Sequence, residues 1–212
     1  CLEFYLSSSR RTNINYCLIV SGGPHLGPKQ ELAATTDYLV QRFKEPNYQK
    51  VMGHRPLVYF FEIADLVKYF GSEDAARDWL NELRRKSVAA GAGNPYFTVM
   101  AFWPPNGATQ VKNLSCDALS AYTGHCNGVP VSDKGFPYSA LAERNRQHWE
   151  TGKRTGQAFI PTLNAGWDNR PMRRPEFPNL DPKDDWFEAP TAQELADNLQ
   201  SAMTWVDDHP SV

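Results

Sequence analysis

Residues 57–62 read LVYFFE, five apolar residues in succession followed directly by a carboxylate. An apolar run without alternation is typical of a strand that is covered on both faces, as in a parallel sheet. We therefore predict a buried strand at residues 57–61, with Glu62 at its carboxyl end. In parallel α/β architectures the functional side chains follow the strands, so this run indicates both a fold class and the place to look for a site.

Four other apolar runs have the length of a strand. They lie at residues 14–20 (INYCLIV), 96–102 (YFTVMAF), 118–122 (ALSAY) and 159–164 (FIPTLN). Residues 103–117 show no clear helical pattern, and we predict a loop there. The sequence thus offers five candidate strands.

Segments with helical periodicity separate most of these runs. One extends from Leu32 to Pro46, and a second is predicted to begin after Ser72, a good N-cap, and to end at Gly91. Residues 138–153 are helical in composition, and the capping box TAQE at Thr191 begins a last helix. Alternating strands and helices predict an α/β fold around a mainly parallel sheet.

The number of β-α units limits the architectures that the chain can form. A (β/α)8 barrel needs about 250 residues and eight strands, whereas this chain has 212 residues and about five β-α units. We expect residues 1–212 to form a single portion of an incomplete TIM-barrel-like domain, with an open doubly wound sheet as the alternative. Because the chain starts at Cys1 rather than Met, we expect a fragment of a longer protein, whose remaining barrel would be its partner.

Composition excludes several classes of function. With 22 basic and 24 acidic side chains, the net charge is −2, and no Lys/Arg run is longer than three residues, so we expect no nucleic-acid partner. No stretch approaches the roughly 18 to 20 apolar residues of a membrane span. The sequence leaves localisation open. It favours a periplasmic or secreted location only if the protein is a glycan-degrading bacterial enzyme.

The four cysteines show none of the short paired spacings of zinc sites, so we expect no metal and no cofactor. Cys17 lies within an apolar run and is interpreted as a small core residue. We favour free thiols, while Cys116 and Cys126 remain a pair that the fold would have to bring together.

The residues that follow the strands form the candidate site. Aromatic rings, carboxylates, amides and guanidinium groups at one rim suit a sugar, because rings stack on pyranose faces and hydroxyls need polar partners. A carbohydrate is therefore the predicted substrate. The predicted binding residues are His25, Glu62, Trp103, Tyr122, Trp167, Asp168, Asn169 and Arg170, with Glu62 and Asp168 as the catalytic candidates.

Each candidate also has a purely structural interpretation. Glu62 could cap the next helix or pair with Lys68 or Arg55, and His25 and His125 could be ordinary loop residues. The loop GWDNRP at residues 166–171 could hold itself together through an Asx turn and an ion pair. His148 is more simply a core histidine. The segment SGG at residues 21–23 lacks the spacing of a phosphate-binding loop and is more simply a turn.

Some segments also resemble a known family. Residues 37–48 (DYLVQRFKEPNY), 53–58 (GHRPLV) and above all 159–171, with FIP followed by GWDNRP, resemble glycoside hydrolase family 99-like proteins. These are (β/α)8 proteins related to endo-α-mannosidases and are also found attached to polysaccharide biosynthesis enzymes. The resemblance extends in order over nearly the whole chain, from a middle strand to the helix before a late strand.

The resemblance implies a retaining glycoside hydrolase whose paired glutamates lie in an Asn-Glu-x-x-Glu-like segment on a later strand. This sequence contains no such segment, and its Trp167 and Asp168 match a loop motif rather than the acid/base pair. We expect the parent protein to hydrolyse a glycan or polysaccharide. The alternatives are a carbohydrate-binding or structural barrel associated with polysaccharide processing, and an independent α/β domain such as part of a transferase.

Overall fold

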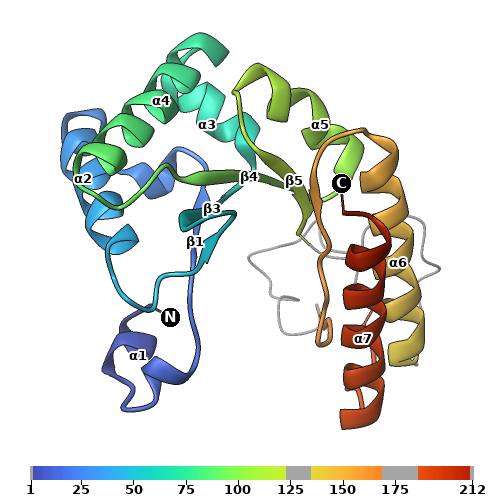
Figure 1. The fold of residues 1–212 in the computed structure, drawn as a ribbon. Coiled ribbons are helices and arrows are strands. Elements are labelled where there is room, and N and C mark those ends of the chain that lie inside the picture. Colours follow the sequence, from blue (N-terminus) through green and yellow to red (C-terminus); the bar gives the residue numbers. More distant parts are fainter. Residues whose placement is uncertain (1, 123–134, 169–185, 211–212) are drawn as a thin grey trace, which may run out of the picture. The chain divides into compact units, whose positions relative to one another are not determined.

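The computed structural model describes residues 2–122, 135–168 and 186–210 (Figure 1). The chain divides into two compact units. Unit 1 comprises Cys1–Ala101 and Gly107–Ala118, and unit 2 comprises Phe102–Asn106 and Leu119–Val212. Both units combine parallel strands with helices, so the predicted α/β class is confirmed.

Unit 1 contains three parallel strands in the order β1-β3-β4. They are β1 (Leu18–Ser21), β3 (Arg55–Phe61) and β4 (Tyr96–Ala101). The short β2 (Lys50–Val51) pairs with β3 in the antiparallel direction. The strand predicted from residues 57–62 is thus the central one, with a neighbour on each side.

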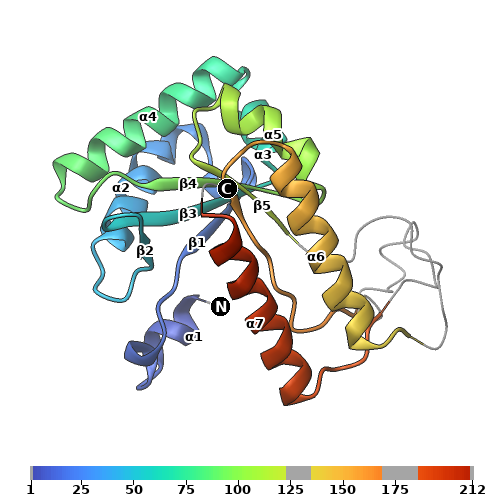
Figure 2. The ribbon, with the colours of Figure 1, turned by 45° about the vertical axis from the view of Figure 1, so that its right-hand side comes forward.

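Helices α2 (Leu32–Phe43), α3 (Ile63–Phe70) and α4 (Glu73–Ala89) lie on one side of these strands (Figures 1 and 2). Phe60 of β3 packs against Trp79 of α4 at a ring distance of 6.2 Å. The Trp79 indole donates a hydrogen bond to the Thr36 hydroxyl of α2, so α2 and α4 are joined inside the core. Helix α1 (Leu2–Ser7) precedes these elements.

The helix signals near Ser72 are confirmed. Its hydroxyl accepts a hydrogen bond from the Ala75 N–H, and Gly91 adopts a positive φ of 72° after the helix ends. Helix α3 was not predicted from the sequence, although Ile63, Leu66 and Phe70 have helical spacing.

The predicted loop at residues 103–117 is wrong, because α5 (Pro104–Asn113) occupies most of it. Two prolines at the start of the segment suggested a loop. Pro104 and Pro105 occupy the first helical turn, however, where backbone N–H groups have no intrahelical acceptor and proline is tolerated. Val111 and Leu114 are buried and anchor this helix.

Unit 2 carries β5 (Ala118–Ala121) from Leu119 onward, β6 (Phe159–Ile160), α6 (Tyr138–Arg154) and α7 (Ala192–Asp208). Strands β5 and β6 are parallel, with Leu119 opposite Phe159. The capping box at the start of α7 is confirmed, since Thr191 and Glu194 exchange both of its hydrogen bonds.

Two predicted strands are shorter than expected. Of the strand predicted at residues 14–20, only the end forms part of β1. Tyr16 instead pairs with the segment before β2, and the Tyr16 carbonyl accepts a hydrogen bond from the Gln49 N–H at 2.7 Å. Ile14 remains 70% exposed. The strand predicted at residues 159–164 ends after the two residues of β6, because Pro161 has no N–H to donate. Thr162 then bonds to Ala121 through its hydroxyl instead.

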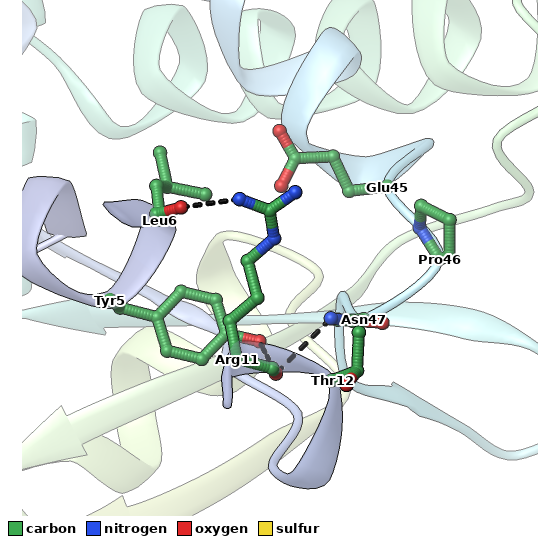
Figure 3. Close-up of a pocket in the computed structure, with 7 residues that line it drawn as sticks. All are labelled: Tyr5, Leu6, Arg11, Thr12, Glu45, Pro46 and Asn47. Carbon is green, nitrogen blue, oxygen red and sulfur yellow. Dashed lines mark hydrogen bonds between the residues drawn. The ribbon is translucent and has the colours of Figure 1, made fainter. Parts of the chain in front are cut away.

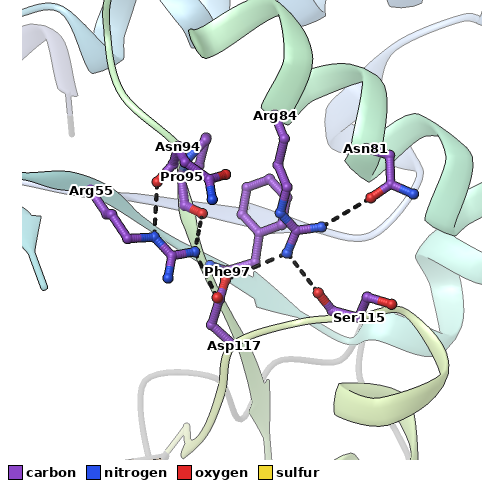
Figure 4. Close-up of polar contacts among 8 residues, drawn as sticks. All are labelled: Arg55, Asn81, Arg84, Asn94, Pro95, Phe97, Ser115 and Asp117. Carbon is purple, nitrogen blue, oxygen red and sulfur yellow. Dashed lines mark hydrogen bonds and ion pairs between the residues drawn. The ribbon is translucent and has the colours of Figure 1, made fainter.

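The amino ends of β3 and β4 are joined by ion pairs and hydrogen bonds around Asp117 (Figure 4). The Asp117 carboxylate accepts from Arg55 at 2.6 Å, from Arg84 at 3.5 Å and from the Phe97 N–H at 2.8 Å. Arg55 also donates to the carbonyls of Asn94 and Pro95. We call the group Arg55, Arg84 and Asp117 the amino-edge clamp.

Candidate functional site

A pocket of about 650 Å³ lies in unit 1 beside the segments that follow β1 and β3. The segment after β1 contributes Gly23, Gly27 and Pro28, and α3, which follows β3, contributes Asp65, Lys68 and Tyr69. Because β1 and β3 are parallel, their carboxyl ends lie at the same edge of the sheet. We call this cavity the carboxyl-edge pocket.

Tyr69 fixes the wall of this pocket. Its hydroxyl donates to the Gly27 carbonyl at 3.0 Å, which ties α3 to the loop after β1. The ring lies so close to Gly23 that a Cβ atom at residue 23 would stand 2.5 Å from the Tyr69 Cβ. Lys29 places its ammonium group 5.8 Å from the centre of the same ring. Residue 23 must therefore be glycine, because the Tyr69 side chain leaves no room for a Cβ atom there.

The pocket offers charged groups of both signs. Asp65 lies in the first turn of α3 and Lys68 in the last, and both are exposed. Neither forms an ion pair with another residue in the described part of the chain. An acceptor and a donor near an aromatic ring are thus available to a polar ligand.

Glu62 stands at the carboxyl end of β3, as predicted, in a left-handed backbone conformation with φ of 54°. Its side chain is exposed and makes no capping hydrogen bond to α3. Arg55, one suggested partner, instead pairs with Asp117. Neither structural interpretation of Glu62 is therefore observed among the described residues. Left-handed conformations of residues other than glycine cost free energy and are often found at functional sites.

His25 is exposed in a short 3-10 helix, Pro24–Leu26, in the same loop as Gly23 and Gly27. It does not line the carboxyl-edge pocket. Sequence reasoning missed Lys68 and Tyr69, because helix α3 itself was not predicted. The apolar spacing of residues 63–70 would have revealed it.

In unit 2, the ring of Tyr122 packs against two other aromatic rings, those of Phe102 and Trp167. The ring centres of Phe102 and Tyr122 are 5.3 Å apart, and those of Tyr122 and Trp167 are 6.3 Å apart. Phe102 and Tyr122 are 41% and 37% exposed, high values for rings of this size. The structure thus brings two predicted binding residues, Tyr122 and Trp167, together with Phe102, which was not predicted. We call these three residues the aromatic row.

Trp103 points elsewhere, and its ring packs against His148 of α6 at 5.2 Å. His148 is 4% exposed, which agrees with its interpretation as a core residue. Burial, with a smaller contribution from Arg144, lowers the pKa of His148 below its usual value. The imidazole is therefore neutral at pH 7.

The remaining predicted residues divide between described and undescribed parts. Asp168 is exposed, and its backbone forms an antiparallel bridge with Trp186. Asn169, Arg170 and His125 lie outside the described residues. The two catalytic candidates fall in different units, with Glu62 in unit 1 and Asp168 in unit 2.

A second pocket of unit 1, of about 360 Å³, lies between the N-terminal segment and the turn after α2 (Figure 3). The Arg11 side chain enters it and donates to the Leu6 carbonyl at 2.5 Å, while the Arg11 carbonyl accepts from Tyr5 and Asn47. Glu45 is engaged by Arg42 at 2.6 Å and by the Tyr16 hydroxyl. These contacts already occupy most of the polar groups and join the N-terminal segment to α2.

The described residues contain no group of three His, Cys, Asp or Glu side chains that could hold a metal ion. Cys17 and Cys116 are free thiols, and Cys126 lies outside the described part. Burial raises the pKa of both thiols, that of Cys116 to about 12, so neither is a reactive thiolate at neutral pH.

Comparison with known proteins gives no relative. No protein-family model matches the chain, and no curated protein or solved structure is significantly similar to it. Among the described residues, no helix is long and apolar enough to cross a membrane.

Proposed function

We propose that this chain binds a carbohydrate in the carboxyl-edge pocket, as part of a glycan-processing α/β protein. The observation that carries the proposal is the pocket itself, where Asp65, Lys68 and Tyr69 line about 650 Å³ of space. This volume falls within the roughly 300–1,000 Å³ typical of small-molecule sites.

The chemistry of the lining supports a sugar in particular. A carboxylate accepts hydrogen bonds from adjacent hydroxyls, an ammonium group donates to sugar oxygens, and an aromatic ring provides an apolar surface for C–H groups. Asp65, Lys68 and Tyr69 supply one of each. The partly exposed aromatic row of unit 2 offers a second surface of the kind that sugar rings contact.

A barrel origin for the fold is part of the same proposal. In a doubly wound sheet helices cover both faces, whereas in a (β/α)8 barrel they lie outside and the strands face one another within. Helices α2, α3 and α4 of unit 1 all lie on one side of its strands (Figure 2). Ile19 of β1 is 51% exposed, an unusual value for an apolar strand residue. Both observations favour an incomplete barrel.

Hydrolysis of a glycosidic bond is the second candidate, and the state of Glu62 favours it. Glycoside hydrolases use two carboxyl groups, one on each side of the scissile bond. Glu62 and Asp65 follow the same strand, and neither is engaged by a cation within the described residues. Of the two, Asp65 lines the pocket while Glu62 is held in a strained backbone conformation.

The test measures binding of a panel of oligosaccharides, including α-mannosides, by calorimetry. For the glycan that binds, we expect Asp65→Asn to weaken the affinity about tenfold, because a charged acceptor becomes a neutral amide. The matched control is Asp78→Asn on α4, which removes another exposed carboxylate of unit 1.

Absence of binding by every glycan, or equal losses for the two variants, would contradict the proposal. A loss with Trp167→Ala but not with Asp65→Asn would move the site to the aromatic row. Release of reducing ends that disappears in Glu62→Gln would support hydrolysis.

A further inference from the structure

Helix α7 lies alongside α6 in unit 2 and packs against it through one row of side chains (Figures 1 and 2). In this row, Asn198 and Ala202 are buried, and Leu195 contacts an apolar cluster built mostly from α6. The Trp205 ring lies 6.1 Å from that of Trp149. The members of the row are separated alternately by three and four residues, so they share one face of the helix.

A second row on α7 is apolar but exposed to solvent. Leu199 and Met203 are each 54% exposed, and Val206 is 45% exposed. The row consists of Ala192, Ala196, Leu199, Met203 and Val206. We call it the α7 seam. Single exposed apolar residues are ordinary, whereas a contiguous apolar surface indicates a place where another element packs.

The spacing of the α7 seam favours a helix as the element that packs there. Four of its five residues directly follow a residue of the buried row, so the two rows lie about 100° apart on the helix surface. Helix α7 thus has two apolar faces, and only one packs against α6. The seam repeats at intervals of four, three, four and three residues. This narrow pattern is the one by which two helices pack side by side in a coiled coil.

The charge of α7 indicates the chemistry of the second helix. Helix α7 contains no Lys or Arg, and its carboxylates are Glu194, Asp197, Asp207 and Asp208. Asp207 directly follows Val206 and therefore lies beside the seam. Lys153 of α6 lies on the other face, where it contacts His209, which continues the buried row. The seam is thus flanked by negative charge, to which the carboxyl end of the helix dipole adds.

A second copy of α7 does not fit this charge pattern. Both ends of the helix are acidic, so a parallel or an antiparallel pair of copies would place carboxylates against carboxylates. Charged residues beside the apolar seam select the partner in helix pairs, and like charges oppose pairing. A helix with Lys or Arg beside its apolar seam is complementary instead.

We propose that the α7 seam binds a basic amphipathic helix of a partner protein. The partner packs apolar side chains against Leu199, Met203 and Val206, and its Lys or Arg side chains lie beside Asp197 and Asp207. The seam is only about 21 Å long, so the complex is small and reversible. The inference does not rest on carbohydrate binding, because the carboxyl-edge pocket belongs to unit 1 and shares no residue with the seam.

The experiment titrates the full chain into a fluorescent peptide of about three heptads and follows the fluorescence anisotropy. The peptide carries Leu at the a and d positions and Lys at the e and g positions. One reference peptide has Glu in place of every Lys, and a second is a scrambled peptide with the composition of the first. We expect saturable binding of the Lys peptide and binding at least about tenfold weaker for both references.

Variants of the seam locate the binding. Leu199→Gln and Met203→Gln change exposed side chains, and each should weaken binding of the Lys peptide about tenfold, because an apolar contact is lost. Val88→Gln on α4 is the matched control, since Val88 is 55% exposed and lies in unit 1. It should leave the affinity unchanged. Circular dichroism checks that all three variants keep the helical content of the native chain.

Four results would overturn the proposal. One is the absence of saturable binding up to about 1 mM of the chain. Another is equal binding of the Lys peptide and its scrambled form, which would indicate general attraction to acidic surfaces. The third is an unchanged affinity in both seam variants. The fourth is a dimer of the chain that Met203→Gln dissociates in analytical ultracentrifugation, which would assign the seam to a second copy.

Discussion

The two edges of the strands in unit 1 differ in how their polar groups are used. At the amino edge, the Asp117 carboxylate and the guanidinium groups of Arg55 and Arg84 are bonded to one another or to backbone carbonyls (Figure 4). At the carboxyl edge, Glu62 and Asp65 are exposed and make no ion pair within the described residues. The first arrangement stabilises the fold, and the second leaves groups available to a ligand. This division is expected of parallel β-α architectures.

The largest expected effect comes from breaking the amino-edge clamp. Asp117→Ala removes the carboxylate that pairs with both guanidinium groups and accepts from the Phe97 N–H, and should lower the free energy of unfolding by about 3 kcal/mol. Chemical denaturation measures this value. Asp37→Ala, which removes an exposed pair with Lys86, should cost less than about 1 kcal/mol. Equal losses of unfolding free energy in the two variants would show that the amino-edge clamp does not stabilise the fold.

The next largest effect concerns the contact of Gly23 with Tyr69. Gly23→Ala places a Cβ atom 2.5 Å from the Tyr69 Cβ, so the loop or α3 must move. We expect a loss of about 2 kcal/mol together with altered ligand binding. Gly91→Ala meets no atom within 4 Å and should cost only about 1 kcal/mol, because its φ is positive. A milder effect at residue 23 than at residue 91 would contradict the close contact.

The smallest effect tests the backbone strain at Glu62. Replacing Glu62 by glycine relieves the left-handed conformation and should raise the free energy of unfolding by about 0.5–1 kcal/mol. Met52→Gly is the matched control, since Met52 also has a positive φ but precedes β3 at the amino edge. Both variants should gain stability, and Glu62→Gly alone should affect a glycan-dependent activity. A loss of stability in Glu62→Gly would show that its side chain supports the fold.

The sequence predicted those parts of the fold that local chemistry determines. Ser72 and Thr191 identified two helix starts through the oxygen atoms that cap backbone N–H groups, and residues 57–61 identified the central strand. Helix α5 was missed because Pro104 and Pro105 indicate a loop unless they fall in a first turn. The length of β6 depends on Pro161 and on side-chain contacts from α6, which periodicity does not record.

The candidate site was less accessible to sequence reasoning. The rule that functional residues follow strands located the region around Glu62 and Gly23. The same rule predicted both Tyr122 and Trp167 as binding residues, and their rings are in contact. It gave no information on Tyr69, whose role depends on α3 folding back against the loop after β1.

The most direct test of the central claim is a map of backbone amide chemical-shift changes during titration with the glycan that binds. We expect shifts at the carboxyl edge, at Gly23, Gly27, Lys68 and Tyr69, and none at the amino edge, at Phe97 and Asp117. Shifts confined to the amino edge, or no saturable shift at the carboxyl edge, would contradict that claim.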